Sequence, residues 1–179
     1  ITVYGDYDVD GVTSVSVLCL YLRSVGADAD YYIPNRATDG YGINTAALEG
    51  LKKQGTSLVI TVDTGITAAE ETEYARSLGM DLVITDHHEC HTDLPRAAAV
   101  VNPHRPDCPY PFKELAGVGV VFKLISAMEE NRTGESRLQV AVRMFASYAD
   151  LVAIGTIADV MPVCGENRII IRQGLAMIE

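Results

Sequence analysis

The segment SLVITVDTG, residues 57–65, decides the fold class of this chain. Its first six residues are apolar or β-branched on both faces, a pattern typical of a strand buried inside a parallel sheet. The strand then runs into Asp63, followed by Thr64 and Gly65, as expected where a strand gives way to a turn. The segment therefore predicts a buried parallel strand with an acid at its carboxyl end.

Strands and helices alternate on both sides of this segment. Further strands are predicted at residues 1–4, 29–33, 81–85 and 98–101. Helices are predicted at 12–25, at 44–54 with Asn44 as the N-cap, and at 68–79 with Thr67 as the N-cap. After Pro111 the pattern is helical, over 114–129, 137–149 and 150–160, while 168–179 begins as a strand or a helix. The alternation predicts an α/β fold, an open and mainly parallel five-stranded sheet flanked by helices (Rossmann-like), with a helical C-terminal part.

The composition is that of one globular domain. The chain has 179 residues and is 48% hydrophobic, and none of its apolar runs approaches the roughly 20 residues that span a bilayer, so we expect no membrane association. Its four cysteines show no Cys-x-x-Cys spacing, which indicates reduced thiols and a cytoplasmic protein. Both ends of the sequence lie inside predicted elements, so we expect a piece of a longer protein. The oligomeric state is not predicted.

The charge is concentrated in the first half of the chain. The net charge is −10, and residues 1–90 hold 14 acids against five bases. A nucleic-acid binder usually has a basic surface, which this chain lacks. A concentration of acidic residues in one half of the chain is instead compatible with a cation-binding site.

Acids and histidines follow three of the predicted strands. The first strand leads into Asp6, Asp8 and Asp10, the third into Asp63, and the fourth into Asp86-His87-His88. Ligands of open α/β sheets bind beyond the carboxyl ends of the strands, so these side chains are expected to converge. Taken singly, each Asp is more simply a turn former or helix cap.

Two other patterns in the sequence offer alternative metal sites, for calcium and for zinc. The pattern Asp6-x-Asp8-x-Asp10-Gly11 resembles the start of a calcium-binding loop, but position 17, where that loop needs a glutamate, is Val17. Cys90, His91, His104 and Cys108 would offer zinc ligands, but their spacing fits no compact zinc finger.

Carboxylate and imidazole ligands suit manganese or magnesium better than a structural zinc. Enough ligands are present for two ions, and a pair of ions activates water for in-line attack on phosphorus. The chain has no Gly-x-Ser-x-Gly elbow and no phosphate-binding Gly-x-x-x-x-Gly-Lys-[Ser/Thr] loop, which disfavours a serine hydrolase or a P-loop ATPase.

Four ordered motifs resemble those of the DHH phosphoesterase family: DYDVDG (6–11), VDTG (62–65), DHH (86–88) and GTIAD (155–159). Additional segments resemble the RecJ-type single-strand-specific exonucleases of that family: IPNR (33–36), GYG (40–42), VNP (101–103), LAGVG (115–119) and GENR (165–168). The resemblance covers essentially the whole chain and implies 5′-to-3′ hydrolysis of single-stranded DNA with manganese or magnesium, in DNA repair and recombination.

The resemblance also assigns roles to residues. It implies that the metal ligands are Asp8, Asp10, Asp63, His87 and Asp159, with Asp6 as a further ligand or a supporting residue. Asp63 would bridge the two ions and, with His87 and His88, form the catalytic set. His88 would face the scissile phosphate, and Asp86 would orient His87.

Three further residues are candidate contacts to phosphate or DNA. Arg36 has a guanidinium that matches phosphate oxygens, although it is equally well explained as a surface arginine. Gly117 and Gly119 precede or open a helix, where backbone N–H groups bind phosphate, although tight packing explains them at least as well.

We predict a catalytic domain over residues 1–165 and the start of a linker to a C-terminal domain over 166–179. Single-stranded DNA and further domains of the same chain are the predicted partners. Two alternative functions stay open: a DHH enzyme that acts on oligonucleotides, cyclic dinucleotides or pyrophosphate, and a non-catalytic scaffold subunit.

Overall fold

The computed structural model describes residues 1–179 except 37–39, 41 and 92. Its centre is a five-stranded sheet in which all neighbouring strands are parallel, in the order β2-β1-β3-β4-β5. The strands are β1 (Thr2–Tyr4), β2 (Asp30–Tyr32), β3 (Leu58–Val62), β4 (Asp81–Thr85) and β5 (Ala99–Val101). The predicted fold class is therefore confirmed, and β3 is the central strand.

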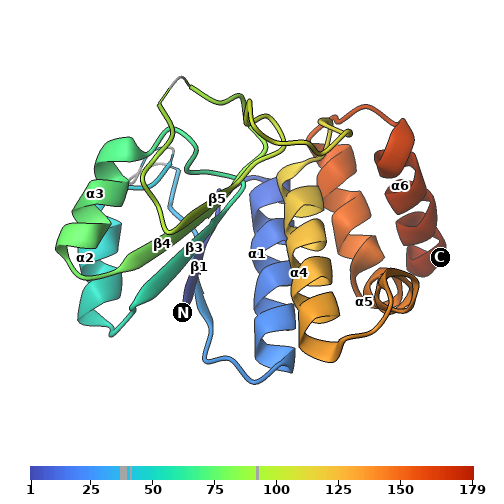
Figure 1. Ribbon diagram of the computed structural model, residues 1–179, viewed down its shortest axis with the longest axis horizontal. Helices are drawn as coiled ribbons and strands as arrows, with labels where there is room; N and C mark the ends of the chain where they lie inside the picture. Colours follow the sequence, from blue (N-terminus) through green and yellow to red (C-terminus); the bar gives the residue numbers. More distant parts are fainter. Residues whose placement is uncertain (37–39, 41, 92) are drawn as a thin grey trace.

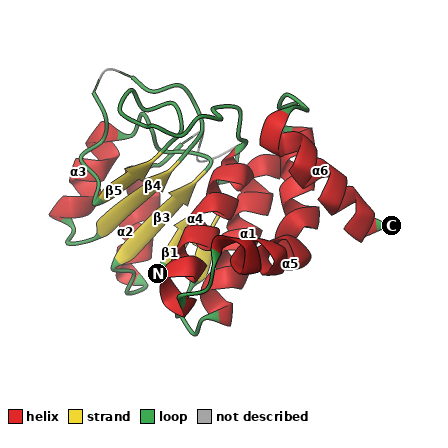
Figure 2. Ribbon diagram, turned by 45° about the vertical axis from the view of Figure 1, so that its right-hand side comes forward, coloured by secondary structure: helices red, strands yellow, loops and turns green. Residues whose placement is uncertain are grey.

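In the described part of the chain, six helices surround the sheet: α1 (Val9–Ser24), α2 (Thr45–Lys53), α3 (Ala69–Ser77), α4 (Gly117–Thr133), α5 (Arg137–Ala158) and α6 (Gly165–Ile178). Figure 1 shows them in layers, with α2 and α3 on one face of the sheet and α1 and α4 on the other. Helix α5 packs on α1 and α4, and α6 packs on α5. Figure 2 shows the loops that follow the strands gathered beyond the arrowheads, at one end of the sheet.

Alternation along the strands builds one core on each face of the sheet. Val3 and Ile60 belong to the cluster shared with α1, α4 and α5, whereas Tyr4 and Val59 belong to the cluster shared with α2 and α3. All four side chains are buried, as expected of strands covered on both faces.

Two details of the predicted helices are wrong. Thr67 is not the N-cap of α3; that position is Ala68, which provides no side-chain cap. The predicted helices 137–149 and 150–160 are one continuous helix, α5, because Ala149 and Asp150 lie within regular helix and no breaker separates them. Among the described residues, α5 is the one helix long and apolar enough to cross a bilayer, and in this structure it packs against α1, α4 and α6.

Residues 165–178 form helix α6 rather than an extended segment. Asn167, Ile170 and Ile171 are buried, and a Cβ on Gly174 would clash with the backbone of Ala149 in α5. Helix α6 thus packs closely on the rest of the fold. The predicted domain boundary at residue 165 stays a prediction.

Candidate metal centre

Asp63 lies immediately after β3, at the middle of the sheet's carboxyl edge. Its backbone is left-handed, with φ 59°, and its side chain is 2% exposed. Helix α4 begins against it, since a Cβ on Gly117 would lie 2.6 Å from Asp63 Oδ1. Only a glycine at position 117 therefore lets the N-terminus of α4 approach this carboxylate so closely.

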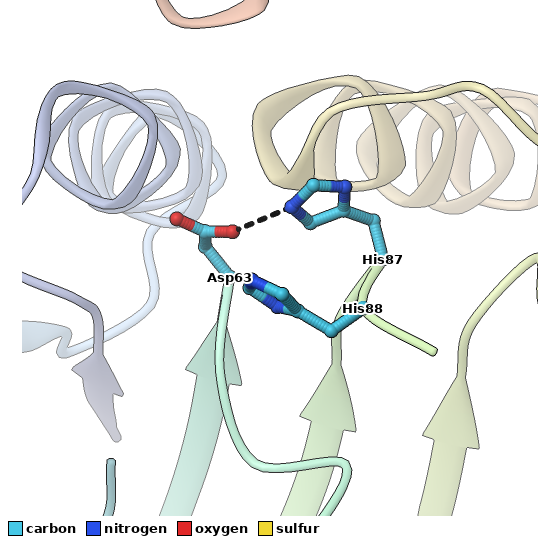
Figure 3. A group of neighbouring side chains, drawn as sticks. All are labelled: Asp63, His87 and His88. Atoms are coloured by element: carbon cyan, nitrogen blue, oxygen red, sulfur yellow. Dashed lines mark ion pairs between the residues drawn. The ribbon is translucent and has the colours of Figure 1, made fainter. Parts of the chain in front are cut away.

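His87 follows β4, the neighbouring strand, and its ring points at Asp63 (Figure 3). His87 Nε2 lies 3.1 Å from Asp63 Oδ1, 3.6 Å from Asp159 Oδ2 and 3.8 Å from Asp10 Oδ2. Within the described residues, neither His87 Nε2 nor Asp63 Oδ1 has a hydrogen-bond partner, although both atoms are buried. Two buried polar atoms left without partners and aimed at the same point are the mark of a ligand-binding site.

Asp10, in the first turn of α1, also caps another helix. Its carboxylate accepts hydrogen bonds from the backbone N–H groups of Gly117 (2.6 Å) and Val118 (2.9 Å) at the start of α4. The N-cap residue of α4, Ala116, has no side chain that could do so. The N–H of Gly117 is thus bound to Asp10, and the predicted phosphate contact at Gly117 stays a prediction.

Asp86 contacts both histidines, the ring of His88 and the backbone N–H of His87. Its predicted role in orienting His87 stays a prediction. Asp86 Oδ1 lies 2.7 Å from His88 Nδ1 and accepts the backbone N–H of both histidines, while Oδ2 accepts the N–H of Ile66. The hydrogen bond with Asp86 raises the pKa of His88. His88 itself is 46% exposed, so Asp86 holds a partly exposed imidazole whose protonated form it favours.

Sequence reasoning assigned no role to Asn102, which the structure places behind the histidines. Asn102 is 3% exposed; its side-chain amide donates to the backbone carbonyl of His88 (2.9 Å) and accepts from the N–H of His104 (2.7 Å). The loop after β5 is thereby tied to the loop after β4. The VNP motif was visible in the sequence, but nothing local in it indicated the partner.

The two remaining acids of the first loop differ in exposure. Asp6 is buried and accepts the N–H of Tyr7 (2.7 Å), whereas Asp8 is exposed and caps α1 by accepting the N–H of Gly11 (2.9 Å). Both carboxylates lie near Asp63. The turn depends on Gly11, because a Cβ there would lie 2.5 Å from the carbonyl oxygen of Asp6.

Three overlapping groups of ligand atoms result, in each of which the atoms lie within 4.8 Å of one another: Asp6, Asp8 and Asp63; Asp10, His87 and Asp159; and Asp63, His87 and His88. We call the seven residues in these groups the acid cage. Asp63 and His87 each belong to two groups, so adjacent ions would share ligands. The hard oxygen donors and imidazoles suit manganese or magnesium, and the residues present fit such ions.

The electrostatics of the cage are unfavourable without a cation. Burial, followed by the negative charges of Asp10 and Asp8, raises the pKa of Asp63 to about 10. Burial raises the pKa of Asp10 to about 6, although the N–H groups of Val118 and Gly117 oppose the shift. The pKa values of Asp6 and Asp159 are also raised, chiefly by burial. A bound divalent cation would reverse these shifts by stabilising the carboxylates.

The other predicted site residues lie around the cage. Asp159 is the C-cap of α5, with its side chain 27% exposed. The guanidinium of Arg36 lies 5.3 Å from the ring centroid of Tyr7. Tyr7 is the residue between the cage residues Asp6 and Asp8 in the sequence. Gly119 is buried in the first turn of α4, where a Cβ would crowd Leu115, and its phosphate contact stays a prediction.

The rejected zinc alternative finds no support in the described part of the chain. Cys90, His91, His104 and Cys108 form none of the ligand groups found there. His104 instead pairs with Glu89, at 3.2 Å.

Comparison with known proteins places this arrangement in a family. The family model described as the DHH family, N-terminal domain, matches residues 1–156. The chain is 50% identical to the single-stranded-DNA-specific exonuclease RecJ of Bacillus subtilis over 98% of its own length and 21% of the relative's. It is 42% identical to RecJ of Escherichia coli, over 99% of its own length and 32% of the relative's. The chain thus spans about a fifth to a third of these relatives.

Solved structures agree with the sequence relatives. A crystal structure of exonuclease RecJ bound to manganese superimposes with a TM-score of 0.83 at 36% identity, covering 98% of this chain and 42% of the other. RecJ from Thermus thermophilus in complex with Mn²⁺ gives a TM-score of 0.77 at 35% identity, covering 98% of this chain and 24% of the other. With the family model matched over most of its length, the chain belongs to the DHH family and carries the N-terminal domain of that family.

Proposed function

We propose that this domain is the catalytic core of a manganese- or magnesium-dependent phosphodiesterase that degrades single-stranded DNA from the 5′ end. The observation that carries the proposal is a pair of buried atoms, Asp63 Oδ1 and His87 Nε2, which lie 3.1 Å apart inside the acid cage and have no hydrogen-bond partner among the described residues. The proposal is supported by relatives named as single-stranded-DNA-specific exonucleases and by a RecJ structure bound to manganese.

The cage would hold two ions, one beside Asp6, Asp8 and Asp63 and one beside Asp10, His87 and Asp159. When bound, the ions supply Lewis acidity at the phosphate and a water acidic enough to act as a nucleophile. The chain offers no Gly-x-Ser-x-Gly nucleophile elbow, which agrees with attack by water.

The residues of the chain orient and stabilise the reacting groups. The hydrogen bonds at Asp10 fix its carboxylate against the N-terminus of α4, and the left-handed backbone at Asp63 turns that side chain into the cage. The contact with Asp86 keeps a proton on His88 Nδ1 and favours the imidazolium, which is a strong donor to a phosphate oxygen. His88 would therefore stabilise the charge that develops during hydrolysis.

DNA retention must come largely from outside the acid cage. With a net charge of −10 the domain repels phosphates, because affinity for DNA rests on lysine and arginine contacts. Arg36, beside Tyr7, is the candidate contact for a phosphate next to the cage. We propose that further domains of the full-length protein supply the remaining basic surface.

The test is hydrolysis of labelled single-stranded DNA by the full-length protein with manganese. Asp63→Asn should reduce the rate at least about 1,000-fold while leaving the fold intact, since Asn keeps the shape of Asp and tolerates the left-handed backbone. The matched control is Asp81→Asn, an exposed residue at the start of β4, which should retain the parent's rate.

Two outcomes would contradict the proposal. One is an Asp63→Asn variant as active as the parent. The other is a parent protein that hydrolyses cyclic dinucleotides or pyrophosphate faster than long single strands. Comparing DNA labelled at the 5′ end with DNA labelled at the 3′ end establishes the polarity.

A further inference from the structure

The end of helix α5 is built differently from the ends of the helices before it. Helices α1, α2, α3 and α4 all end at a glycine with positive φ: Gly26 (86°), Gly55 (91°), Gly79 (68°) and Gly134 (69°). Helix α5 turns in the same left-handed conformation at Val160, with φ 58°. Valine is a poor residue for this conformation, because its branched Cβ crowds the backbone.

The backbone around Val160 forms a regular Schellman ending. The N–H of Val160 donates to the carbonyl of Ile157 (3.1 Å), and the N–H of Met161 donates to the carbonyl of Thr156 (3.3 Å). Glycine is the usual residue at this position of the motif. The hydrogen bonds need only the backbone, so they give no reason for a valine.

Packing gives no reason for it either. The residue Val160 is 86% exposed, more than any other large hydrophobic residue in the described part of the chain. A strained residue with its apolar side chain in water costs stability and adds no core contact. Strain of this kind is retained where a side chain has a function.

The position of Val160 indicates that function. It follows Asp159, whose carboxylate lies 3.6 Å from His87 Nε2 in the acid cage. Ile157, one turn earlier, is 46% exposed, and Val9, between the cage residues Asp8 and Asp10, is 47% exposed. Exposed apolar side chains at the last turn of α5 and the first turn of α1 are thus close in sequence to cage residues of both helices.

We propose that Val160 is a substrate-binding residue whose side chain packs against the deoxyribose and base of the nucleotide whose phosphate lies at the acid cage. The proposal rests on the proposed function and names how that site holds its substrate. A nucleotide has a charged phosphate beside an apolar sugar and base face, and the cage with its exposed valine has the complementary arrangement. Glycine would relax the backbone but would remove this contact.

The experiment compares four variants of the full-length protein: Val160→Gly, Val160→Asn, Val160→Ile and Val142→Asn. Glycine and asparagine accept the left-handed backbone without the apolar contact, whereas isoleucine keeps the contact and the strain. Val142 is the matched control, a valine 64% exposed near the opposite end of α5. Steady-state kinetics on single-stranded DNA, thermal denaturation and manganese titration by calorimetry are measured for each.

We expect Val160→Gly and Val160→Asn to raise KM for single-stranded DNA about 5-fold, the loss of one partly buried apolar contact, with kcat within about 2-fold of the parent. Their thermal midpoints should equal or exceed the parent's, and manganese affinity should be unchanged. Val160→Ile and Val142→Asn should keep the parent's KM.

Every other result counts against the inference. An active parent with unchanged KM in Val160→Gly and Val160→Asn overturns the inference alone. A loss of manganese affinity in those variants would show that Val160 only positions Asp159, which also overturns it. A parent without manganese-dependent hydrolysis overturns the proposed function, and this inference with it.

Discussion

Two buried carboxylates, Glu129 and Asp63, have opposite electrostatic surroundings in this fold. Glu129 in α4 accepts hydrogen bonds from Tyr21 (3.2 Å), Arg132 (2.8 Å) and Arg143 (2.9 Å), and these partners, Arg132 first, lower its pKa to about 2. Asp63 has acids and two histidines for neighbours but no arginine or lysine among the described residues, and burial raises its pKa to about 10. The chain neutralises the first acid with its own cations and leaves the second to be neutralised from solution.

The difference separates a structural cluster from a functional one. Glu129 joins α1, α4 and α5 through Tyr21, Arg132 and Arg143, so its hydrogen bonds stabilise the packing of three helices. The acid cage lacks arginine and lysine, and mutual repulsion among its carboxylates destabilises the metal-free fold. A perturbed carboxyl pKa alone therefore does not identify a site. At Asp63 the shift is upward and the carboxyl lies among other potential metal ligands, which is the setting expected of a functional site.

The largest expected effect is stabilisation of the fold by manganese bound in the acid cage. At a manganese concentration 100-fold above Kd, the free energy of unfolding should rise by about 2.7 kcal/mol. At one fixed manganese concentration, the gain should be greater at pH 8 than at pH 5. A raised carboxyl pKa means that the metal-free fold loses stability as the pH rises above the ordinary value of 3.8, and manganese binding requires the deprotonated form.

Thermal denaturation with manganese or with EDTA, at both pH values, measures this gain. A gain that is absent, or larger at pH 5 than at pH 8, would contradict the assignment of the cage as a metal centre.

The next effect is expected at the other carboxylate. Glu129→Gln should lower the free energy of unfolding by about 1–3 kcal/mol, because hydrogen bonds to charged groups are lost in a buried place. Since the folded pKa of Glu129 is lowered, its contribution is complete above about pH 4.5 and disappears as the pH falls toward 2. Urea denaturation between pH 2 and 7 tests this.

Glu130→Gln is the control at the neighbouring position. The Glu130 carboxylate forms an ion pair of 3.5 Å with Arg137, whose side chain is highly exposed, so solvent weakens this interaction. It should change stability by less than about 1 kcal/mol. Equal losses in the two variants would show that the Glu129 cluster has no special role.

The smallest effect has the opposite sign. Asp63→Asn removes a buried carboxyl whose pKa the metal-free fold raises to about 10. Because folding then no longer has to protonate this group, the substitution should raise the stability of the metal-free protein by about 1 kcal/mol while abolishing stabilisation by manganese. Denaturation in EDTA at pH 8 measures the gain. A large loss of stability would instead show that Asp63 is needed for folding.

The sheet and most of the acid cage were predictable because they follow from topology. Parallel strands end at one edge, so acids placed after β1, β3 and β4 had to meet, and these three strands are neighbours. Asp159 was found through the family motif rather than from its surroundings. The end of an apolar helix carries no local signal that it faces His87.

What the sequence could not show depends on contacts between distant segments. The pairing of Asp86 with His88, the amide of Asn102 behind them and the cap that Asp10 gives α4 all require three-dimensional positions. Likewise, the Glu129 cluster joins residues more than 100 positions apart, Tyr21 and Glu129, and no local pattern connects them.

The wide spacing of the cage along the chain affects how the protein matures. Its first carboxylate is at residue 6 and its last at residue 159, so during translation nearly the whole domain must leave the ribosome before the set is complete. Nascent chains that still lack the end of α5 would capture manganese weakly. Tight ion uptake would then coincide with the final docking of α5, after most of this domain has been synthesised.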